Sequence, residues 1–282
     1  MLEAVFLMLP ALTAVIYQEL HCILVFLGSA VFCLAAGALL RGKKPENTTI
    51  FSAEGYVSVA FCWVALSLCG AIPLYFSGSF PNPVDALFEI VSGFTTTGSS
   101  VLLDVESVHR AVLIWRSFSH WVGGMGILVF ILAFIPNKGN GTIVHLMKAE
   151  SPGPNVSKLV PKIRYTAAIL YAIYFGMTLI QIILLLISKM PLFDTLCITF
   201  GTAGTGGFSI KSDGCAGYTM LQQGIITTFM ILFGVNFNTY FLLLLRRFRR
   251  AAASEEVRGY FLIILVAIGI ITLNIHGMYD SL

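Results

Sequence analysis

The sequence predicts an all-α integral membrane protein built from repeated span–pore loop–span units. Apolar residues make up 57% of the 282 residues and charged residues only 11%, whereas soluble domains carry about 25% charged residues. Apolar runs of roughly 20 residues, the length that crosses a hydrocarbon core, recur along the chain. Two shorter segments with one common spacing, which begin at Asp85 and Asp194, interrupt these runs. Soluble domains large enough for a separate active site are not expected between the runs.

The apolar runs divide the chain into an N-terminal helix pair, two repeats and the start of a third. Polar residues 18–21 separate the first two apolar runs, which favours a helix pair before the repeats. Membrane spans are expected over 51–76, 111–135, 165–187, 220–245 and 260–275. The regions are the transmembrane helix pair 1–40, the first repeat 50–136, a cytoplasmic connector 137–164, the second repeat 165–250, and the first span of a truncated third repeat 258–282.

Basic residues set the expected orientation in the membrane. The connectors 41–44, 137–164 and 246–258 hold 13 of the 17 Lys and Arg residues. These connectors lie on one side if the spans alternate, and the positive-inside rule makes that side cytoplasmic. The two short segments then enter the membrane from outside. The run Arg246–Arg250 follows a span directly, so it indicates a topological anchor or a contact for anionic lipid rather than nucleic-acid binding.

Each short segment predicts a helix that stops partway through the membrane. Gly98 lies thirteen positions after Asp85, and Gly207 lies thirteen positions after Asp194. Each segment ends in Thr and Gly. The two Asp residues are expected as helix N-caps, because an Asp there accepts hydrogen bonds from free backbone amides. A helix that enters from outside directs the negative end of its dipole toward a cation near the membrane midplane.

The Thr/Gly ends of these helices, Thr95–Gly98 and Thr205–Gly207, favour a cation filter. Extended backbone at membrane depth is tolerated only where protein buries it or a watery path lies beside it. Backbone carbonyls in potassium-type filters replace the hydration shell of the ion. Glycine allows a positive φ that turns carbonyls inward. The pattern therefore predicts a cation pore.

Residues after the first Thr/Gly end are candidates for support of the filter. Arg116 and His120 are four apart on the next expected span and so share a helix face. Either they form an ion pair with Glu89 and brace the filter, or they reach the lipid headgroups; we favour bracing. Gly123 and Gly124 allow neighbouring helices to approach closely.

The remaining polar and sulfur-containing residues do not predict catalysis or a resident cofactor. The sequence has no CxxC pair and no Cys/His cluster at the spacing of a zinc site, so the cysteines are interpreted as small buried apolar residues. Paired carboxylates, Ser/His pairs and His/Cys pairs are not expected to meet at membrane depth. We therefore expect neither an enzyme nor a transition-metal site. The six cysteines are Cys22, Cys33, Cys62, Cys69, Cys197 and Cys215.

Several motifs, taken in order, resemble the potassium-uptake pore subunit of the bacterial Trk system, within the wider Trk/Ktr/HKT superfamily. They are DALFE at 85–89 with SGFTTTG at 92–98, HWVGGMGI at 120–127, KAESPGP at 148–154 and GGFS at 206–209. The resemblance implies K⁺ as the transported ion and four span–loop–span repeats around one pore. It also implies filter contributions from Thr96, Thr97, Gly98, Thr205, Gly206 and Gly207.

The resemblance further implies a homodimer, a cytoplasmic nucleotide-binding regulatory subunit, and a multi-pass location in the bacterial cytoplasmic (inner) membrane. Membrane lipid is an expected contact, and nucleic acid is not. The sequence stops at Leu282, before a third pore loop. We therefore expect a fragment of a longer pore subunit. The alternative is a nonconducting half-transporter that acts as an assembly or regulatory membrane subunit.

Overall fold

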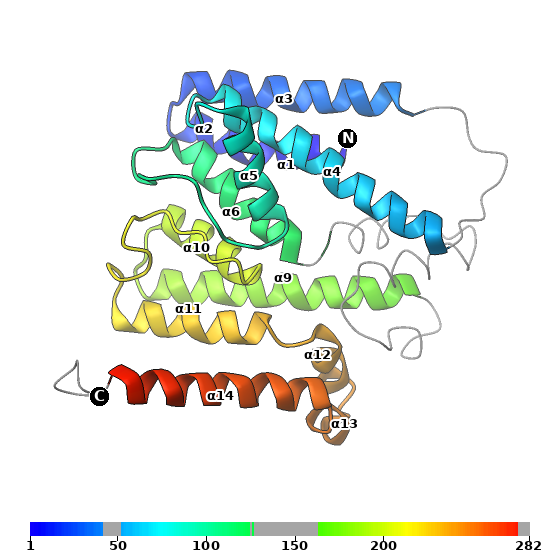
Figure 1. Cartoon of the computed structure of the whole chain (residues 1–282), viewed down its shortest axis with the longest axis vertical. Coiled ribbons are helices and arrows are strands. Elements are labelled where there is room, and N and C mark those ends of the chain that lie inside the picture. Colours follow the sequence, from blue (N-terminus) through cyan, green and yellow to red (C-terminus); the bar gives the residue numbers. More distant parts are fainter. Residues whose placement is uncertain (42–51, 125, 127–162, 276–282) are drawn as a thin grey trace. The chain divides into compact units, whose positions relative to one another are not determined.

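The structure is a computed structural model that describes residues 1–41, 52–124, 126 and 163–275. The chain forms two compact units, Met1–Phe233 and Gly234–Leu282. The described residues are mostly helical and contain no strand. The first unit (Figure 1) contains α1 (Leu2–Phe6), α2 (Met8–Ile16), α3 (Leu20–Leu39), α4 (Ser52–Phe76), α5 (Pro83–Phe94), α6 (Arg110–Gly124), α9 (Ile163–Ile187), α10 (Leu192–Ala203) and α11 (Met220–Phe233).

Two classes of helix are distinguished by their length. Among the described residues, Leu20–Leu39, Tyr56–Phe76, Ala167–Ile187 and Glu255–Ile275 are long and apolar enough to cross a membrane. The helices α5 and α10 have 12 residues each, so each rises only about 18 Å. That length is well short of a hydrocarbon core of about 30 Å. The two helices that the sequence predicts to stop partway are therefore too short to span the hydrocarbon core.

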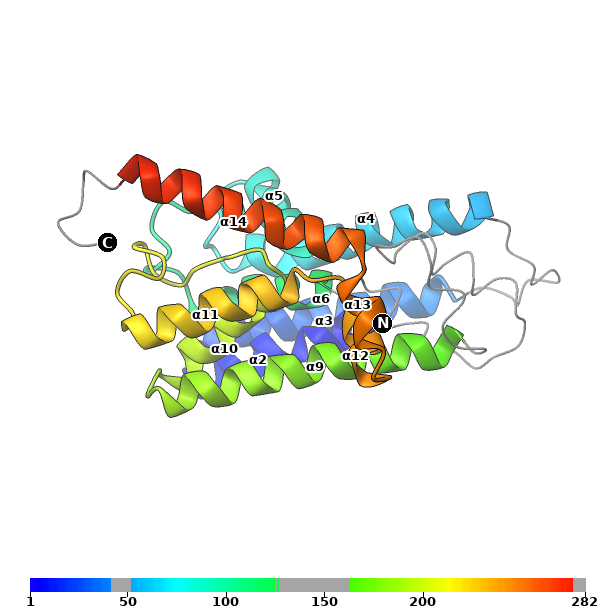
Figure 2. The same cartoon turned by 90° about the horizontal axis from the view of Figure 1, so that it is seen from below.

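The helix α6 has the central position in the first unit. It contacts α2, α5 and α10, while α5 also contacts α4, and α10 also contacts α9 and α11. The two views show α9 and α11 side by side with nearly parallel axes and opposite chain directions (Figure 1 and Figure 2). The short helices α5 and α10 thus both pack on α6, and each also packs on long helices of its own, α4 for α5 and α9 and α11 for α10.

Buried aromatic side chains hold α6 against the first short helix. Trp115 of α6 is fully buried, and its Nε1 donates a hydrogen bond to the Gly70 carbonyl oxygen of α4 at 3.0 Å. Its ring meets that of Phe94 in α5 edge to face, with 6.0 Å between the centroids. Full burial of one such side chain contributes about 1.5–3 kcal/mol. These contacts fix the end of α5 relative to α4 and α6.

The segment expected as a span over 220–245 is not one continuous helix. The helix α11 ends at Phe233, and α12 (Phe237–Leu244) begins as a separate helix, followed by α13 (Phe248–Ala252) and α14 (Glu255–Ile275). Asn236 caps α12, because its side chain accepts a hydrogen bond from the Asn238 amide at 3.0 Å. Its Nδ2 also donates to Glu256 Oε2 at 2.6 Å. This capping residue begins a new helix, which the apolar pattern did not indicate.

The N-terminal region differs in detail from one continuous span. The expected run from Val5 to Tyr17 forms α1 and α2, which are separated at Leu7. The connector over 137–162 and the expected span beyond Gly124 lie outside the described residues, apart from residue 126. The motif at 148–154 lies outside them as well. The division into repeats therefore remains a prediction.

Candidate functional site

The first turns of the two short helices correct the prediction that Asp85 and Asp194 are N-caps. Asn82 caps α5, and its side chain accepts a hydrogen bond from the amide two residues ahead. At α10 the N-cap position is Pro191, which offers no side-chain acceptor. Pro83 is the first residue of α5, where proline is favoured, and Pro191 directly precedes α10, so each helix begins before its Asp. Both Asp residues lie in the first turn, where they still favour the positive end of the dipole.

The loop after α10 returns to the start of that helix. The Tyr218 hydroxyl donates a hydrogen bond to Asp194 Oδ2 at 3.1 Å. Burial and the neighbouring Asp194 carboxylate raise the pKa of Tyr218 above its ordinary value, so the hydroxyl keeps its proton and stays a donor. The Lys211 ammonium lies 4.3 Å from the centre of the Tyr218 ring. The segment that follows the helix therefore runs back along it.

The segment after α5 returns in the same way, toward Glu89 in the middle of that helix. Arg116 of α6 donates a hydrogen bond from Nε to Glu89 Oε1 at 2.6 Å, and its Nη2 lies 2.6 Å from the same oxygen in the ion pair. Ser100 Oγ donates to the same oxygen at 2.8 Å, and the Val101 amide donates to Oε2 at 3.0 Å. Glu89 and Arg116 are 0% and 2% exposed. Arg116 thus pairs with Glu89, and together they hold the segment that follows Gly98.

The C-terminus of α5 ends in a defined hydrogen-bonded motif. The Thr97 amide donates to the Ser92 carbonyl oxygen at 2.9 Å, and the Thr96 amide donates to the Gly93 carbonyl oxygen at 3.0 Å. This pair of bonds is the Schellman motif, which satisfies carbonyls that the helix leaves without partners. Thr96 occupies its left-handed position, with φ of 55°.

The same motif ends α10, 109 positions later in the sequence. The Gly206 amide donates to the Gly201 carbonyl oxygen at 3.1 Å, and the Thr205 amide donates to the Thr202 carbonyl oxygen at 2.9 Å. Thr205 has a φ of 54°. The two ends therefore share their backbone geometry, although Ser92 corresponds to Gly201 and Gly93 to Thr202.

The left-handed threonines are the most unusual feature of these ends. Glycine usually occupies this position of the Schellman motif. A positive φ at a β-branched residue is an outlier, and such strain costs on the order of 1–3 kcal/mol. Two residues beyond each threonine, Gly98 and Gly207 also have positive φ, of 77° and 79°. Strained backbone of this kind clusters at functional sites, and here it recurs at equivalent positions.

The two helix ends meet each other and the C-terminal part of α6. A Cβ added at Gly123 would overlap the Phe94 carbonyl oxygen and lie 2.9 Å from Thr96 Cγ2. At Gly124 it would lie 2.9 Å from the Gly204 Cα. Consecutive glycines of α6 therefore touch the end of α5 and the end of α10. A Cβ at Gly98 would overlap the Gly206 carbonyl oxygen, so the two Thr/Gly segments are also in direct contact.

His120 fills the space behind the second Thr/Gly segment. Its side chain is fully buried, and its ring stacks on Phe208 with 4.1 Å between centroids and 20° between planes. A Cβ at Gly206 would overlap this ring, and one at Gly204 would overlap the His120 carbonyl oxygen. Of the two residues expected to pair with Glu89, only Arg116 does so; among the described residues, no ion pair joins His120 to Glu89.

The sequence did not identify every residue that holds these segments. Ser100 bridges Glu89 and Arg116, and its Oγ lies 3.1 Å from Arg116 Nη2. The ring of Phe208 lies 4.4 Å from the Arg116 guanidinium carbon and also stacks on His120. The Tyr174 hydroxyl donates to the Trp121 carbonyl oxygen at 2.9 Å. Tyr174 and Ser100 carry no spacing signal, whereas Phe208 belongs to one of the motifs noted above.

Comparisons with known proteins agree with this architecture. A family model described as TrkH, cation transport protein, matches residues 23–273. The Trk system potassium uptake protein TrkH of Salmonella typhimurium is 35% identical, over 97% of this chain and 58% of that protein. Trk system potassium uptake protein TrkG of Escherichia coli is 31% identical, over 96% of this chain and 57% of that protein.

A solved structure shows the same fold. The crystal structure of the potassium transporter TrkH from Vibrio parahaemolyticus matches with a TM-score of 0.74 and 25% identity, over 99% of this chain and 58% of that chain. The chain thus spans less than two thirds of the length of these relatives. Because the family model covers most of the chain and relatives above 30% identity cover nearly all of it, the chain belongs to the TrkH family of cation transport proteins.

Proposed function

We propose that the protein takes up K⁺ across the membrane and that backbone carbonyls of 96–98 and 205–207 bind the ion. The observation that carries the proposal is the positive φ at Thr96 and Thr205, two β-branched residues at equivalent positions. The strain of order 1–3 kcal/mol at each position is retained in both copies. A filter that uses the backbone supplies a reason for that strain.

The alternation of backbone angles supports this function of the carbonyls. Thr96 and Gly98 have positive φ and flank Thr97, which does not, and Thr205 and Gly207 flank Gly206 in the same way. A residue with inverted φ rotates the peptide planes beside it, so alternation brings successive carbonyls toward one side. In a regular strand they would point to opposite sides. Carbonyls on one side suit a dehydrated cation, and the helix dipoles of α5 and α10 add to the attraction.

The pair of Arg116 and Glu89 is proposed to brace this filter without repelling the ion. A lone buried guanidinium near a cation path would raise the energy of the cation. The Glu89 carboxylate cancels that charge and accepts hydrogen bonds from Ser100 and the Val101 amide. The pair therefore fixes the chain just after Gly98 and leaves little net charge.

Further proposals concern what surrounds the pore. Two relatives are named as proteins of a Trk system, which favours a homodimer with a cytoplasmic nucleotide-binding regulatory subunit, in the bacterial cytoplasmic membrane.

The residues Arg246–Arg250 line a shallow pocket, and such basic clusters beside a span bind anionic lipid headgroups. We propose that lipid phosphate occupies this pocket.

Ion flux in proteoliposomes tests the proposed filter. The full-length protein carries either Gly98→Ala, which changes the backbone, or Thr97→Val, which removes a hydroxyl already bonded to Thr95 Oγ1 at 2.8 Å. We expect Gly98→Ala to lower the preference for K⁺ over Na⁺ at least about tenfold, and Thr97→Val to change it far less. Equal losses in both variants would contradict a backbone filter. An unmodified protein that carries no K⁺ would favour the nonconducting subunit.

A further inference from the structure

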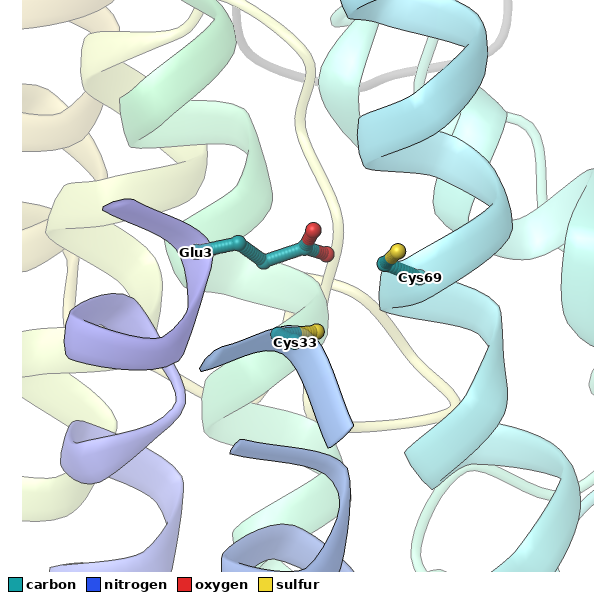
Figure 3. Close-up of side chains that lie close together, drawn as sticks. All are labelled: Glu3, Cys33 and Cys69. Carbon is teal, nitrogen blue, oxygen red and sulfur yellow. The ribbon is translucent and has the colours of Figure 1, made fainter. Parts of the chain in front are cut away.

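Three side chains from different helices meet at one place, away from the Thr/Gly segments. Figure 3 shows Glu3 of α1, Cys33 of α3 and Cys69 of α4 close together, with the Glu3 side chain extending toward α4. A Glu3 carboxylate oxygen and the two Sγ atoms all lie within 4.8 Å of one another. The cysteines are 36 positions apart, so their spacing in the sequence gave no sign of this cluster.

Glu3 gives an independent reason to expect a cation at this cluster. Its side chain is only 5% exposed, and its Oε1 has no hydrogen-bond partner in the part of the chain that the structure describes. The N-terminal ammonium and Cys69 are the polar groups that act on this carboxylate. A Cβ added at Gly70 would lie 3.1 Å from that oxygen, so the carboxylate packs directly on α4. A buried carboxylate oxygen without a hydrogen bond is costly, and a bound cation would lower that cost.

A second cluster provides a contrast, because its carboxylate is already satisfied. Glu19, Cys22 and His109 also bring ligand atoms within 4.8 Å of one another. Both Glu19 oxygens, however, accept hydrogen bonds from the first amides of α6, Arg110 at 2.8 Å and Ala111 at 3.1 Å. The His109 side chain is 48% exposed. Glu19 therefore acts as a helix cap, and this cluster needs no metal to explain it.

We propose that Glu3, Cys33 and Cys69 bind a thiophilic divalent cation of the Zn²⁺ class. Thiolate and carboxylate are ligands that such cations prefer, at about 2.3 Å for sulfur and about 2.0–2.2 Å for oxygen. Tetrahedral geometry places the two sulfur atoms about 3.8 Å apart, so small side-chain movements complete the site. Each thiol releases its proton to solvent as its metal–sulfur bond forms. Water completes the fourth position.

The site would join α1 and α3 to α4 close to the first short helix. A Cβ added at Gly70 would lie 3.0 Å from Ile90 and 3.1 Å from Phe94, both in α5. A cation held by Cys69, one residue before Gly70, thus lies just behind the packing of α5. The site lies outside the proposed filter, and its existence does not depend on which ion the protein transports.

Metal binding to purified full-length protein tests the proposal. Reduced, metal-free protein in lipid nanodiscs is titrated with Cd²⁺ as a spectroscopic probe, followed by Zn²⁺ competition. We expect one equivalent bound, a thiolate-to-metal ultraviolet band, proton release and a raised melting temperature. Cys33→Ser, Cys69→Ser and Glu3→Gln should each weaken binding at least about tenfold. Cys62→Ser is the matched control on α4, about 10 Å along the helix from Cys69, and should leave binding unchanged.

Several outcomes would overturn the site. They are no ultraviolet band with both thiols reduced, binding that survives Cys33→Ser and Cys69→Ser together, or equal weakening by Cys62→Ser. A disulfide between Cys33 and Cys69 in protein isolated without reductant, combined with no Cd²⁺ binding after reduction, would assign the pair to redox chemistry instead. Melting temperatures without metal show whether each variant is folded. Because binding is measured without ion flux, loss of the metal site and failure of the K⁺ proposal are distinguishable.

Discussion

Alanine substitution at three glycines with nearly equal backbone angles separates backbone strain from packing at the proposed filter. Gly78, Gly98 and Gly207 have φ of 79°, 77° and 79°. A Cβ in this left-handed conformation costs about 1–2 kcal/mol wherever it is placed. Among the described residues, no atom lies within 4 Å of a Cβ added at Gly78 or Gly207. Gly78→Ala therefore measures the strain alone.

Gly98→Ala adds a steric term to that strain. A Cβ there would overlap the Gly206 carbonyl oxygen and lie 2.8 Å from its carbon, and both are backbone atoms that cannot rotate away. Overpacking of this kind costs about 1–3 kcal/mol. We expect Gly98→Ala to lower the free energy of unfolding by about 2–5 kcal/mol, compared with about 1–2 kcal/mol for Gly78→Ala and Gly207→Ala.

Unfolding of the full-length protein by denaturing detergent in mixed micelles measures these differences. Gly78→Ala is the reference because it lies in the loop between α4 and α5, within the same unit. Equal costs for Gly98→Ala and Gly78→Ala would refute the contact between the two Thr/Gly segments. A Gly207→Ala cost well above the reference would show that a further group packs on the second segment in the complete pore.

Three further predictions concern the strained threonine, the buried ion pair and the orientation. Thr96→Gly should raise the free energy of unfolding by about 1 kcal/mol, because glycine adopts a positive φ without strain; a lower value in detergent unfolding would show that the threonine is not strained. Glu89→Gln and Arg116→Met should each cost about 3–5 kcal/mol, because each leaves one buried partner uncompensated, and the double variant should cost less than their sum; additive costs in the same assay would argue against coupling. In a cysteine-free background, single cysteines at Asp104 and Arg249 should react with an impermeant maleimide from outside only at position 104; outside labelling at 249 would overturn the topology.

The sequence was sufficient to predict the short helices because their lengths and Thr/Gly ends are local properties. The ion pair of Arg116 with Glu89 was also a stated alternative, since charged residues inside a membrane seek partners. The break at Asn236 was missed because one capping side chain outweighed an apolar pattern that continued on both sides. The N-caps were misplaced because Pro83 and Pro191 already determine where each helix begins.

Contacts between distant segments could not be read from the sequence. The cluster of Glu3, Cys33 and Cys69 depends on how α1, α3 and α4 pack, and no local pattern records that packing. The same holds for the ring of His120 against Gly206. A glycine next to a bulky residue is visible in a sequence only as a glycine, and its partner becomes apparent once the backbones are placed.

The dependence of both Thr/Gly segments on α6 has a consequence for biosynthesis. The helices α5 and α10 are too short to enter a bilayer as independent spans, so each must be drawn in by elements that are already inserted. His120 and Gly124 are translated before residues 192–207, and they form the surface against which the second segment closes. Insertion of α10 thereby becomes a late, templated step, in which the first half of the chain guides the second.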